Sequence, residues 1–431
     1  MPHSLPPLVE ERLRALRERP VEPSDKGLGL LASGTSAPTP ASLAAARPAL
    51  PAAGLSYPVL TLRESALASN LESMAGFCAR AGVELAPHGK TSMSPELAAR
   101  QLASGAWGIT VAAIGQLRAY RAFGFPRLLM ANELVDEAGI AWLAGELAAD
   151  PGFEAYCYVD STDGVAILDR VLTDRPAGRR FPVLVEIGAA RTGCRTDEQA
   201  LAVAKAAAAT STLTVAGVAG YEGSIHGDSQ PQTDDLVASF CQRLAALSGQ
   251  VANLAGASDG FIVTAGGSVY FDVVARELAA ASSAGMTVVL RSGGYLFHDH
   301  GLYRAATPAA RGVAGAPALQ PALELWAQVL SRPEPGLALL SAGRRDAGFD
   351  AGLPVPLRAL RRNGGAADLT GEVTELNDQH AYLRLDPDIL LAPGDLIGLG
   401  ISHPCTTLDK WRLIPVLDEQ DRITDIVHTF F

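Results

Sequence analysis

The run Pro87-His88-Gly89-Lys90-Thr91 places a lysine directly after a short apolar stretch. Most lysines are solvated surface charges. A lysine at the end of an apolar strand instead points into a pocket, where burial lowers the pKa of its amine and favours imine chemistry. The run therefore indicates that Lys90 is a nucleophilic amine, with a plain surface charge as the alternative.

Three later apolar stretches also end in residues that could bind a ligand. They contribute Arg191, then Tyr221 with Glu222, and last the turn Thr264-Ala265-Gly266-Gly267-Ser268. A glycine pair after a strand is commonly only a tight turn, but its N–H groups and the flanking hydroxyls can also hold a phosphate. Residues 291–299 carry an Arg-Ser-Gly-Gly-Tyr run, which either borders the same site or forms a turn between domains.

His403 and Cys405 lie two positions apart near the C-terminus. On an extended strand, side chains two apart point to the same face. Imidazole and thiolate together are typical zinc ligands. The spacing is equally compatible with a buried cysteine beside a structural histidine.

The elements that must position these residues alternate in type from about Tyr57 onward. Short apolar runs are separated by helical patterns, which predicts parallel strands covered by helices. About eight such units match a (β/α)8 TIM-type barrel, whose active site lies where the strands end, and a doubly wound open sheet is the competing topology. The expected strands cover residues 58–62, 83–87, 108–112, 127–131, 153–159, 182–187, 215–221 and 261–264.

Beyond about residue 286 the pattern changes to β-type segments separated by turns. We therefore expect an N-terminal extension (1–55), a barrel domain (56–285) and a mostly antiparallel C-terminal β domain (286–431). In the extension, Leu8–Arg19 predicts a short amphipathic helix, and residues 34–54 predict a loop. The segment 286–290 is assigned to the β domain.

The composition narrows the class of protein. The 431 residues carry a formal charge of −11, which argues against nucleic acid or an anionic membrane as partner. The five cysteines are scattered and odd in number, which is typical of a reducing cytosol. Neither a signal peptide nor an apolar stretch of membrane-spanning length is visible, so we expect a cytoplasmic protein.

Taken together, the motifs resemble those of the fold-type III pyridoxal-phosphate (PLP) enzymes, in the D-threonine aldolase/D-serine dehydratase family. The run 87–91 resembles the family's lysine motif, and Glu186-Ile187-Gly188 with Arg191 and Gly193 resembles its glycine-arginine motif. His403-Pro404-Cys405 with Thr406-Thr407 resembles its C-terminal metal pair. The likeness extends from about Tyr57 to the C-terminus and is greatest for the bacterial "amino acid deaminase" branch.

The resemblance implies a PLP cofactor, a divalent metal and an alanine-racemase-like barrel followed by a β domain. It implies that the active site lies at the interface of a homodimer and takes a small D-amino acid. The metal is expected to be zinc, with Mn²⁺ or Mg²⁺ as alternatives. The implied residues are Lys90 as the catalytic Schiff-base lysine, His88 in the cofactor pocket, Arg191 at the phenolic oxygen, Tyr221 at the pyridine nitrogen, Thr264, Gly266, Gly267 and Ser268 at the phosphate, and His403 and Cys405 at the metal.

Two departures from the family concern the lysine motif. Ala86 stands where many relatives have arginine before Pro-His, and Ser92-Met93 stands where many have His-Lys. The metal pair favours one activity over another, because D-threonine aldolases typically have His-x-Asp and dehydratases His-x-Cys. We therefore expect a dehydratase that converts D-serine or D-threonine to a 2-oxo acid and ammonia. Lys90 would remove the α-proton, and the metal would help the β-hydroxyl to leave.

Four alternative activities remain open. A retro-aldol reaction in the same site would give glycine and an aldehyde. A 3-hydroxy-D-aspartate dehydratase or aldolase would need an extra cation, for which His298, Arg304 and Arg344 are candidates. A racemase would need a second base, typically a tyrosine from the partner's β domain, with Tyr295, Tyr303 and Tyr382 as candidates. A non-catalytic PLP-binding protein is usually a bare barrel, which the β domain argues against.

Overall fold

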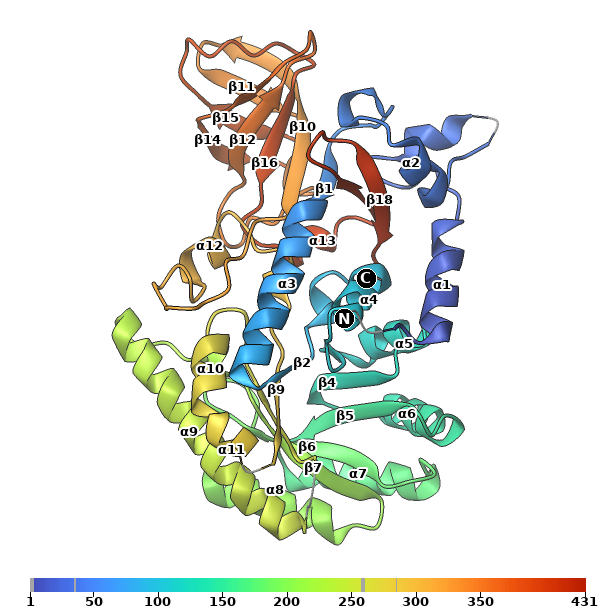
Figure 1. Ribbon diagram of the computed structural model, residues 1–431, viewed down its shortest axis with the longest axis vertical. Coiled ribbons are helices and arrows are strands. Elements are labelled where there is room, and N and C mark those ends of the chain that lie inside the picture. Colours follow the sequence, from blue (N-terminus) through green and yellow to red (C-terminus); the bar gives the residue numbers. More distant parts are fainter. Residues whose placement is uncertain (1–3, 35, 257–259, 284) are drawn as a thin grey trace.

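The computed structural model describes residues 4–34, 36–256, 260–283 and 285–431. Figure 1 shows the barrel in the lower half of the molecule and the β domain above it. None of the described helices is long and apolar enough to cross a membrane.

The barrel is a parallel sheet of eight described strands, in the order β2-β9-β8-β7-β6-β5-β4-β3. Its two ends also meet, because the Thr110 N–H donates to the Pro87 carbonyl at 2.9 Å and the Trp107 N–H to the Leu85 carbonyl at 2.7 Å. The sheet therefore closes, which confirms the (β/α)8 barrel over the open sheet. The strands are β2 (Glu84–Leu85), β3 (Ile109–Val111), β4 (Arg127–Glu133), β5 (Glu154–Val159), β6 (Phe181–Ile187), β7 (Leu213–Gly220), β8 (Ile262–Ala265) and β9 (Thr287–Leu290).

Polar caps fix where the barrel helices begin. Ser94, Asp136, Ser161, Thr196 and Ser229 each accept a hydrogen bond from the backbone N–H three residues later. Such caps stabilise a helix by about 1 kcal/mol each and set the length of the loop that precedes it. The helices are α3 (Glu64–Ala81), α4 (Pro95–Ala103), α5 (Ile114–Ala122), α6 (Glu137–Ala149), α7 (Thr162–Asp174), α8 (Asp197–Ala209), α9 (Gln230–Ala255), α10 (Phe271–Glu277) and α11 (Ala279–Ser283).

A small apolar cluster is built from residues of successive barrel strands. Tyr158 belongs to it and is 1 % exposed, yet it also lines the cavity described below. The cluster therefore forms a packed floor under that cavity. Its buried members are Ala86, Leu129, Tyr158, Leu184, Ala219, Ile262 and Val289.

The β domain is a mostly antiparallel sheet, as expected. A short helix, α12 (Leu302–Ala306), lies between the barrel and this sheet, and α13 (Cys405–Leu408) follows β16. The strands are β1 (Val59–Arg63), β10 (Leu323–Glu334), β11 (Leu337–Leu340), β12 (Val355–Leu360), β13 (Ala366–Asp368), β14 (Glu372–Leu376), β15 (Ala381–Arg384), β16 (Leu396–Gly400), β17 (Leu413–Leu417) and β18 (Ile423–His428).

Two strands belong to the other domain from the one predicted. β1, expected as the first barrel strand, pairs with β10 and β17 of the β domain. β9, assigned to the β domain from the sequence, is the barrel strand between β2 and β8. The predicted boundaries at 56 and 285 therefore need correction. Strand-forming patterns identify strands, but they do not say which neighbours the strands pair with.

The N-terminal extension packs against the β domain on the side of β18 (Figure 1). The expected helix is present as α1 (Pro7–Arg17). Part of the expected loop is a second helix, α2 (Pro40–Ala46), which begins with a capping box between Thr39 and Ser42 and a proline at its first position.

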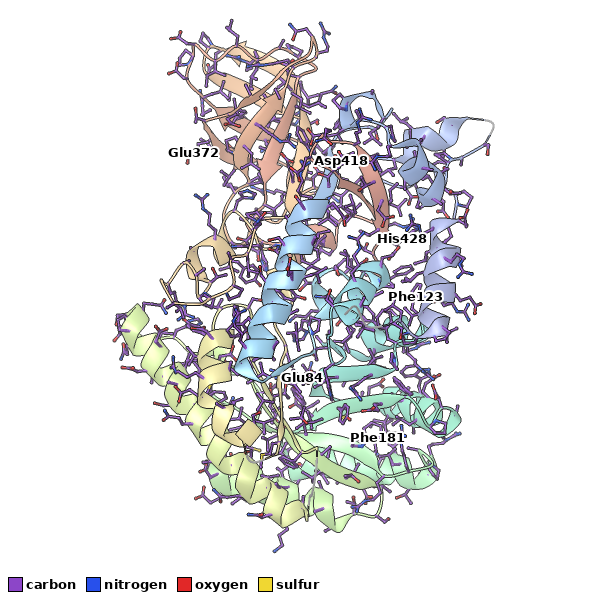
Figure 2. The ribbon with its side chains drawn as sticks, in the orientation of Figure 1. Glu84, Phe123, Phe181, Glu372, Asp418 and His428 are labelled. Carbon is purple, nitrogen blue, oxygen red and sulfur yellow. The ribbon has the colours of Figure 1, made fainter. Side chains whose placement is uncertain are left out.

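Contacts near the C-terminus join the β domain to the barrel. The His428 Nδ1 lies 2.6 Å from Glu96 Oε1 of α4, and the Phe430 ring packs edge-on against Phe123 at 5.0 Å. Figure 2 shows His428 and Phe123 close together at this junction. The two domains are thus held in contact through buried polar and aromatic pairs.

Candidate active site

One cavity of about 540 Å³ lies at the carboxyl ends of the barrel strands and reaches the β domain. Most of the predicted site residues line it, although they are far apart in the sequence. Those predicted residues are His88, Lys90, Arg191, Tyr221, Gly267, Ser268, His403 and Cys405, and they are joined by Asn132, Tyr158, Glu186, Arg291, Gly293, Gly294 and Tyr303 among others.

Lys90 lies in a single 3₁₀ turn, Gly89–Thr91, that follows β2. The turn needs a glycine at 89, because a Cβ there would lie 2.5 Å from the Tyr120 hydroxyl, which donates to the Gly89 carbonyl. Burial lowers the pKa of the Lys90 amine, and Arg191 and Arg291 lower it further against an opposing effect of Cys405. A neutral amine is the nucleophilic form, so the predicted role of Lys90 suits this environment.

Arg191 and Tyr221 lie together on the cavity wall. The Arg191 guanidinium is 4.6 Å from the centre of the Tyr221 ring, a cation–π distance. The loop that carries Arg191 is anchored by the Gly193 N–H, which donates to Asp160 Oδ2 at 3.1 Å. This arrangement presents one cation and one phenol on the same side of the cavity.

The glycine-rich turn after β8 differs from the predicted phosphate cradle. The N–H groups of Gly266 and Gly267 donate to the buried Glu222 carboxylate at 3.0 and 2.5 Å. Thr264 is fully buried and does not line the cavity, and neither does Gly266. Their backbone and side-chain donors are therefore already used within the protein, which gives no support to a phosphate contact from Thr264 or Gly266.

Gly267 and Ser268 do line the cavity, opposite a second glycine pair. The Gly294 N–H donates to Ser268 Oγ at 3.1 Å, and Gly293 and Gly294 form part of the same wall. Gly293 and Gly294 follow β9 and line the cavity, so the run 291–295 borders the site and is more than a turn between domains. The two glycine-containing turns, 267–268 and 293–294, thus form one part of the cavity wall.

Arg291 was not assigned a role from the sequence, because its strand was placed in the wrong domain. It is 3 % exposed, and its guanidinium donates to Thr264 Oγ1 at 2.8 Å and to the Gly220 carbonyl at 2.6 Å. Two neighbouring strands thus hold a buried cation at the cavity floor. An arginine directly after a late barrel strand was the signal that could have identified it.

Several buried polar atoms of the cavity wall have no hydrogen-bond partner among the described residues. They are His88 Nδ1, Tyr158 Oη, Glu186 Oε2 and Arg291 Nε. Unpaired buried polar groups are rare and destabilising, so these atoms suit a bound ligand that is rich in donors and acceptors. PLP carries a ring nitrogen, a phenolic oxygen and a phosphate, and the cations of this pocket complement its negative charge. The residues present therefore fit the cofactor.

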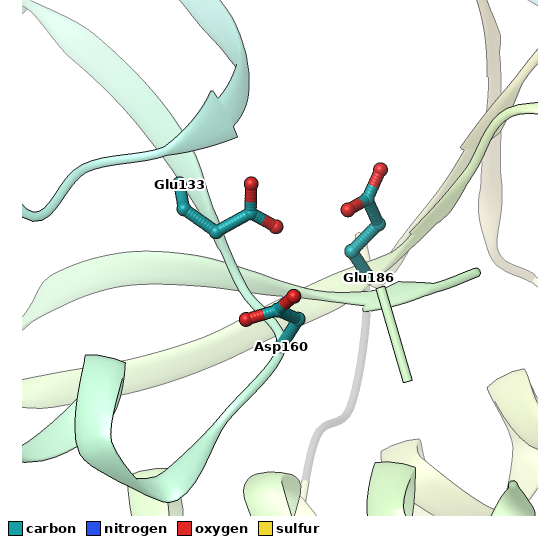
Figure 3. A group of neighbouring side chains, drawn as sticks. All are labelled: Glu133, Asp160 and Glu186. Carbon is teal, nitrogen blue, oxygen red and sulfur yellow. The ribbon is translucent and has the colours of Figure 1, made fainter. Parts of the chain in front are cut away.

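Three carboxylates at the ends of neighbouring strands were not recognised as a group. Glu133, Asp160 and Glu186 follow or end β4, β5 and β6, and they offer oxygens within 4.8 Å of one another. Figure 3 shows the Glu133 carboxyl turned toward Glu186. Burial and the nearby Glu186 raise the pKa of Glu133 to about 8, so this carboxyl is largely protonated at neutral pH. The sequence did carry a signal for this group, since each of three consecutive expected strands has an acidic residue at or near its end.

His403 and Cys405 are brought together, but not on a strand as predicted. β16 ends at Gly400, His403 lies in the following turn, and Cys405 begins α13. A hydrogen bond between the two side chains raises the pKa of His403 to about 9. Burial alone would raise the pKa of the Cys405 thiol, yet His403 and Thr91 lower it overall.

Asp350 positions the imidazole of this pair. The His403 Nδ1 lies 2.7 Å from Asp350 Oδ2, and Thr406 Oγ1 donates to Asp350 Oδ1 at 2.7 Å. A carboxylate on one ring nitrogen orients the imidazole and leaves Nε2 for a metal. With the thiol alongside, the donor set fits a zinc-type ion. The Cys405 Sγ also lies 3.4 Å from Thr91 Oγ1, so the pair faces the lysine turn.

Comparisons with known proteins agree with this geometry. Residues 62–274 match the alanine racemase N-terminal domain, and residues 322–417 match a domain described as "Putative serine dehydratase domain". The chain is 30 % identical over 345 residues to a D-threonine aldolase of Arthrobacter sp., covering 79 % of this chain and 83 % of that protein. It is 27 % identical over 378 residues to a 3-hydroxy-D-aspartate aldolase of Paracoccus denitrificans, covering 84 % and 90 %.

Solved structures share the whole architecture. The D-threonine aldolase from Filomicrobium marinum matches with a TM-score of 0.75 and 24 % identity, covering 89 % of this chain and 97 % of that one. The D-threo-3-hydroxyaspartate dehydratase from Delftia sp. HT23 matches with a TM-score of 0.66 and 20 % identity, covering 87 % and 98 %. Together with the lysine turn and its cavity, these matches show that the chain belongs to the fold-type III PLP-dependent family of D-threonine aldolases and D-serine dehydratases and is a PLP-dependent lyase.

Proposed function

We propose that the protein is a PLP- and divalent-metal-dependent dehydratase of small β-hydroxy D-amino acids such as D-serine or D-threonine, which yields a 2-oxo acid and ammonia. The observation that carries this proposal is the imidazole–thiol pair of His403 and Cys405, which faces the Lys90–Thr91 turn in one cavity. Structures exist of D-threo-3-hydroxyaspartate dehydratase with a histidine, or a cysteine two positions later, replaced by alanine, and the structure of the cysteine variant is of its metal-free form. The same pair spacing supports a dehydratase here.

Lys90 would hold PLP, and the bound cofactor supplies an electron sink for negative charge at the substrate Cα. Arg191 would contact the phenolic oxygen of the cofactor and Tyr221 its pyridine nitrogen, as the family resemblance implies. Gly267, Ser268 and the glycine pair at 293–294 would hold its phosphate, because they line one part of the cavity. Arg291 adds buried positive charge at the cavity floor.

His403 and Cys405 would hold the divalent ion, with zinc favoured by the nitrogen and sulfur donors. Such an ion supplies Lewis acidity toward the substrate β-hydroxyl. Asp350 keeps the imidazole oriented toward the cavity. Lys90 Nζ is the group that would take the proton from Cα, since burial lowers the pKa of its amine and it lies on the cavity wall.

The three residues considered as a cation for a 3-hydroxyaspartate carboxylate do not line the cavity. The described residues that line the cavity do not include His298, Arg304 or Arg344. The His298 Nδ1 accepts the Asp299 N–H, and the Arg344 guanidinium packs on Phe349 at 5.5 Å. The extra cation that a 3-hydroxyaspartate carboxylate would need is therefore not supplied by these candidates.

Within one chain, Tyr295 and Tyr303 do not support a racemase. Tyr295 is buried and receives a hydrogen bond from Gln101 at 3.1 Å, and Tyr382 lies on the surface of the β domain, outside this chain's cavity. Tyr303 does line the cavity, but burial raises its pKa, so it stays protonated and is a poor base. The β domain that completes the cavity also counts against a PLP carrier without catalysis.

We also propose a cytoplasmic homodimer. Each of the five cysteines is free, and four of them are buried, which suits a reducing compartment. The dimer is proposed from the family alone, and light scattering of the purified protein tests it directly.

The deciding experiment mixes the PLP-loaded protein with D-serine, D-threonine and their L-forms, before and after chelation. The proposal expects a 2-oxo acid and ammonia from the D-forms only, lost on chelation and restored by Zn²⁺. Glycine and an aldehyde would instead establish the aldolase activity that the relatives at 30 % and 27 % identity carry. A Cys405→Ala variant is expected to keep the PLP absorption and to lose the zinc-restored turnover.

A further inference from the structure

A lysine of the N-terminal extension reaches the part of the β domain that lies behind the predicted metal pair. The Lys26 Nζ lies 2.6 Å from Asp346 Oδ1 and donates to the Arg345 carbonyl at 2.8 Å. The same ammonium sits 4.1 Å from the centre of the Trp411 ring. The neighbouring Gly27 packs tightly on β1, because a Cβ at that position would lie 2.6 Å from Val59 Cγ2, so the turn around Lys26 is closely packed.

Asp346 lies within the turn 343–350 and accepts hydrogen bonds with both its side chain and its backbone. Its side chain is fully buried, Oδ2 accepts the Gly343 N–H at 2.8 Å, and its carbonyl accepts the Trp411 Nε1–H at 2.9 Å. A buried carboxylate without a nearby cation is strongly destabilising. Lys26 is the cation that forms an ion pair with it, which links the turn to a residue more than 300 positions away.

The C-terminal end of the turn 343–350 contacts the segment that carries the proposed metal ligands His403 and Cys405. The Gly348 N–H donates to Thr407 Oγ1 at 2.9 Å, and Thr407 Oγ1 in turn donates to the His403 carbonyl at 2.9 Å. A Cβ at Gly348 would lie 2.2 Å from Thr406 Oγ1, so the backbone of the turn packs directly against the Thr406 side chain. Two residues further on, Asp350 bonds the His403 imidazole.

We propose that Lys26 is a positioning residue for the metal ligand His403, acting through the buried Asp346 and the turn that carries Asp350. The proposal rests on the proposed function, since it requires a divalent ion at His403 and Cys405. It assigns to the N-terminal extension a role in shaping the site, although both matched domain families begin after it. Losing the ammonium leaves the Asp346 carboxylate unpaired, which displaces the turn and loosens the imidazole.

The test measures metal affinity rather than turnover. PLP-loaded protein is stripped with a chelator and titrated with Co²⁺, whose visible d–d absorption reports thiolate and imidazole coordination at wavelengths beyond the cofactor band. Lys26→Met is expected to weaken Co²⁺ binding about tenfold or more, the usual effect of disturbing a partner of a metal ligand, with the PLP band unchanged. Lys26→Met combined with Asp346→Asn is expected to recover most of the affinity, because the unpaired charge is gone.

Arg47→Met is the matched control, because Arg47 is another extension cation paired with a β-domain carboxylate, Asp418, which does not touch the turn 343–350. It should leave Co²⁺ affinity within twofold of wild type. Equal weakening by this control, or no weakening by Lys26→Met, overturns the proposal. If Lys26→Met does not fold, Lys26→Gln gives the same comparison with a smaller expected loss.

The proposed metal site has its own control. His403→Ala should abolish the Co²⁺ spectrum. If wild type gives no such spectrum, or if His403→Ala leaves it intact, the metal site itself is refuted and the role of Lys26 falls with it. A wild-type spectrum that is lost in His403→Ala and unchanged in Lys26→Met refutes only the role of Lys26.

Discussion

Replacing Glu133 by glutamine should change how the stability of the protein depends on pH. In the folded protein, burial and the neighbouring Glu186 raise the pKa of Glu133 from its ordinary 4.5 to about 8. Between these values the folded state keeps the proton and the unfolded state loses it, so the unfolded state binds fewer protons. The free energy of unfolding therefore falls as the pH rises from about 4.5 to about 8. Glutamine does not titrate and removes this loss.

The size of the effect follows from the surroundings of the carboxyl. For a fully buried group, a pKa change from 4.5 to about 8 would be worth about 5 kcal/mol. Glu133 is only half-buried, and water screens its interaction with Glu186, so we expect about 1–2 kcal/mol. Relative to wild type, Glu133→Gln should therefore gain about this much stability between pH 5 and pH 8.

Urea unfolding of the PLP-loaded protein at several pH values, followed by circular dichroism, measures the difference. Glu137→Gln is the matched control, because that carboxylate lies four residues away in an exposed ion pair with Arg170. The difference in the free energy of unfolding between Glu137→Gln and wild type should not change between pH 5 and pH 8. If the free energy of unfolding of Glu133→Gln and of wild type changed with pH in the same way, the raised pKa of Glu133 beside Glu186 would be refuted.

Three further substitutions test the cofactor site. Lys90→Ala should abolish turnover and the near-visible absorption of the bound cofactor, and PLP should then be removable by dialysis. Arg291→Met removes a buried cation of the cavity floor that Thr264 and the Gly220 carbonyl hold in place at 2.8 and 2.6 Å. Losing one interaction between this charge and the anionic cofactor, about 1.5–3 kcal/mol, should lower the PLP affinity measured by absorbance titration at least tenfold. In Gly294→Ala, the new Cβ would lie 2.5 Å from the Tyr303 ring, and the resulting displacement should weaken PLP binding while the far-ultraviolet circular dichroism stays unchanged.

The sequence predicted the barrel and the position of Lys90 after a barrel strand, because both depend on local patterns. Apolar runs alternate with helical ones at every step of the barrel, and polar residues follow the strands at their carboxyl ends. Pairing between distant strands is not local. β1 and β9 were therefore assigned to the wrong domains, and Arg291, which follows β9, was left without a role.

For a similar reason, the structure gives no support to two of the predicted phosphate contacts, those of Thr264 and Gly266. The two glycines after β8 looked free to bind an anion, but Glu222 from the end of β7 takes both of their N–H groups. Only the packing of neighbouring strands brings that carboxylate to the turn. His403 and Cys405 met as expected, although the turn and the start of α13 bring them together rather than a strand.

The path of the chain between the domains explains why a lysine and an imidazole–thiol pair can share one cavity. The chain passes directly from β1 of the β domain into α3 of the barrel, and it returns between β9 and β10. Two crossings and the junction at His428 restrict how the domains can rotate against each other. A bare barrel would keep the Lys90 pocket and could still bind PLP, but Cys405 would have no fixed place beside Thr91. The proposed metal site therefore depends on the β domain, whereas cofactor binding alone needs only the barrel.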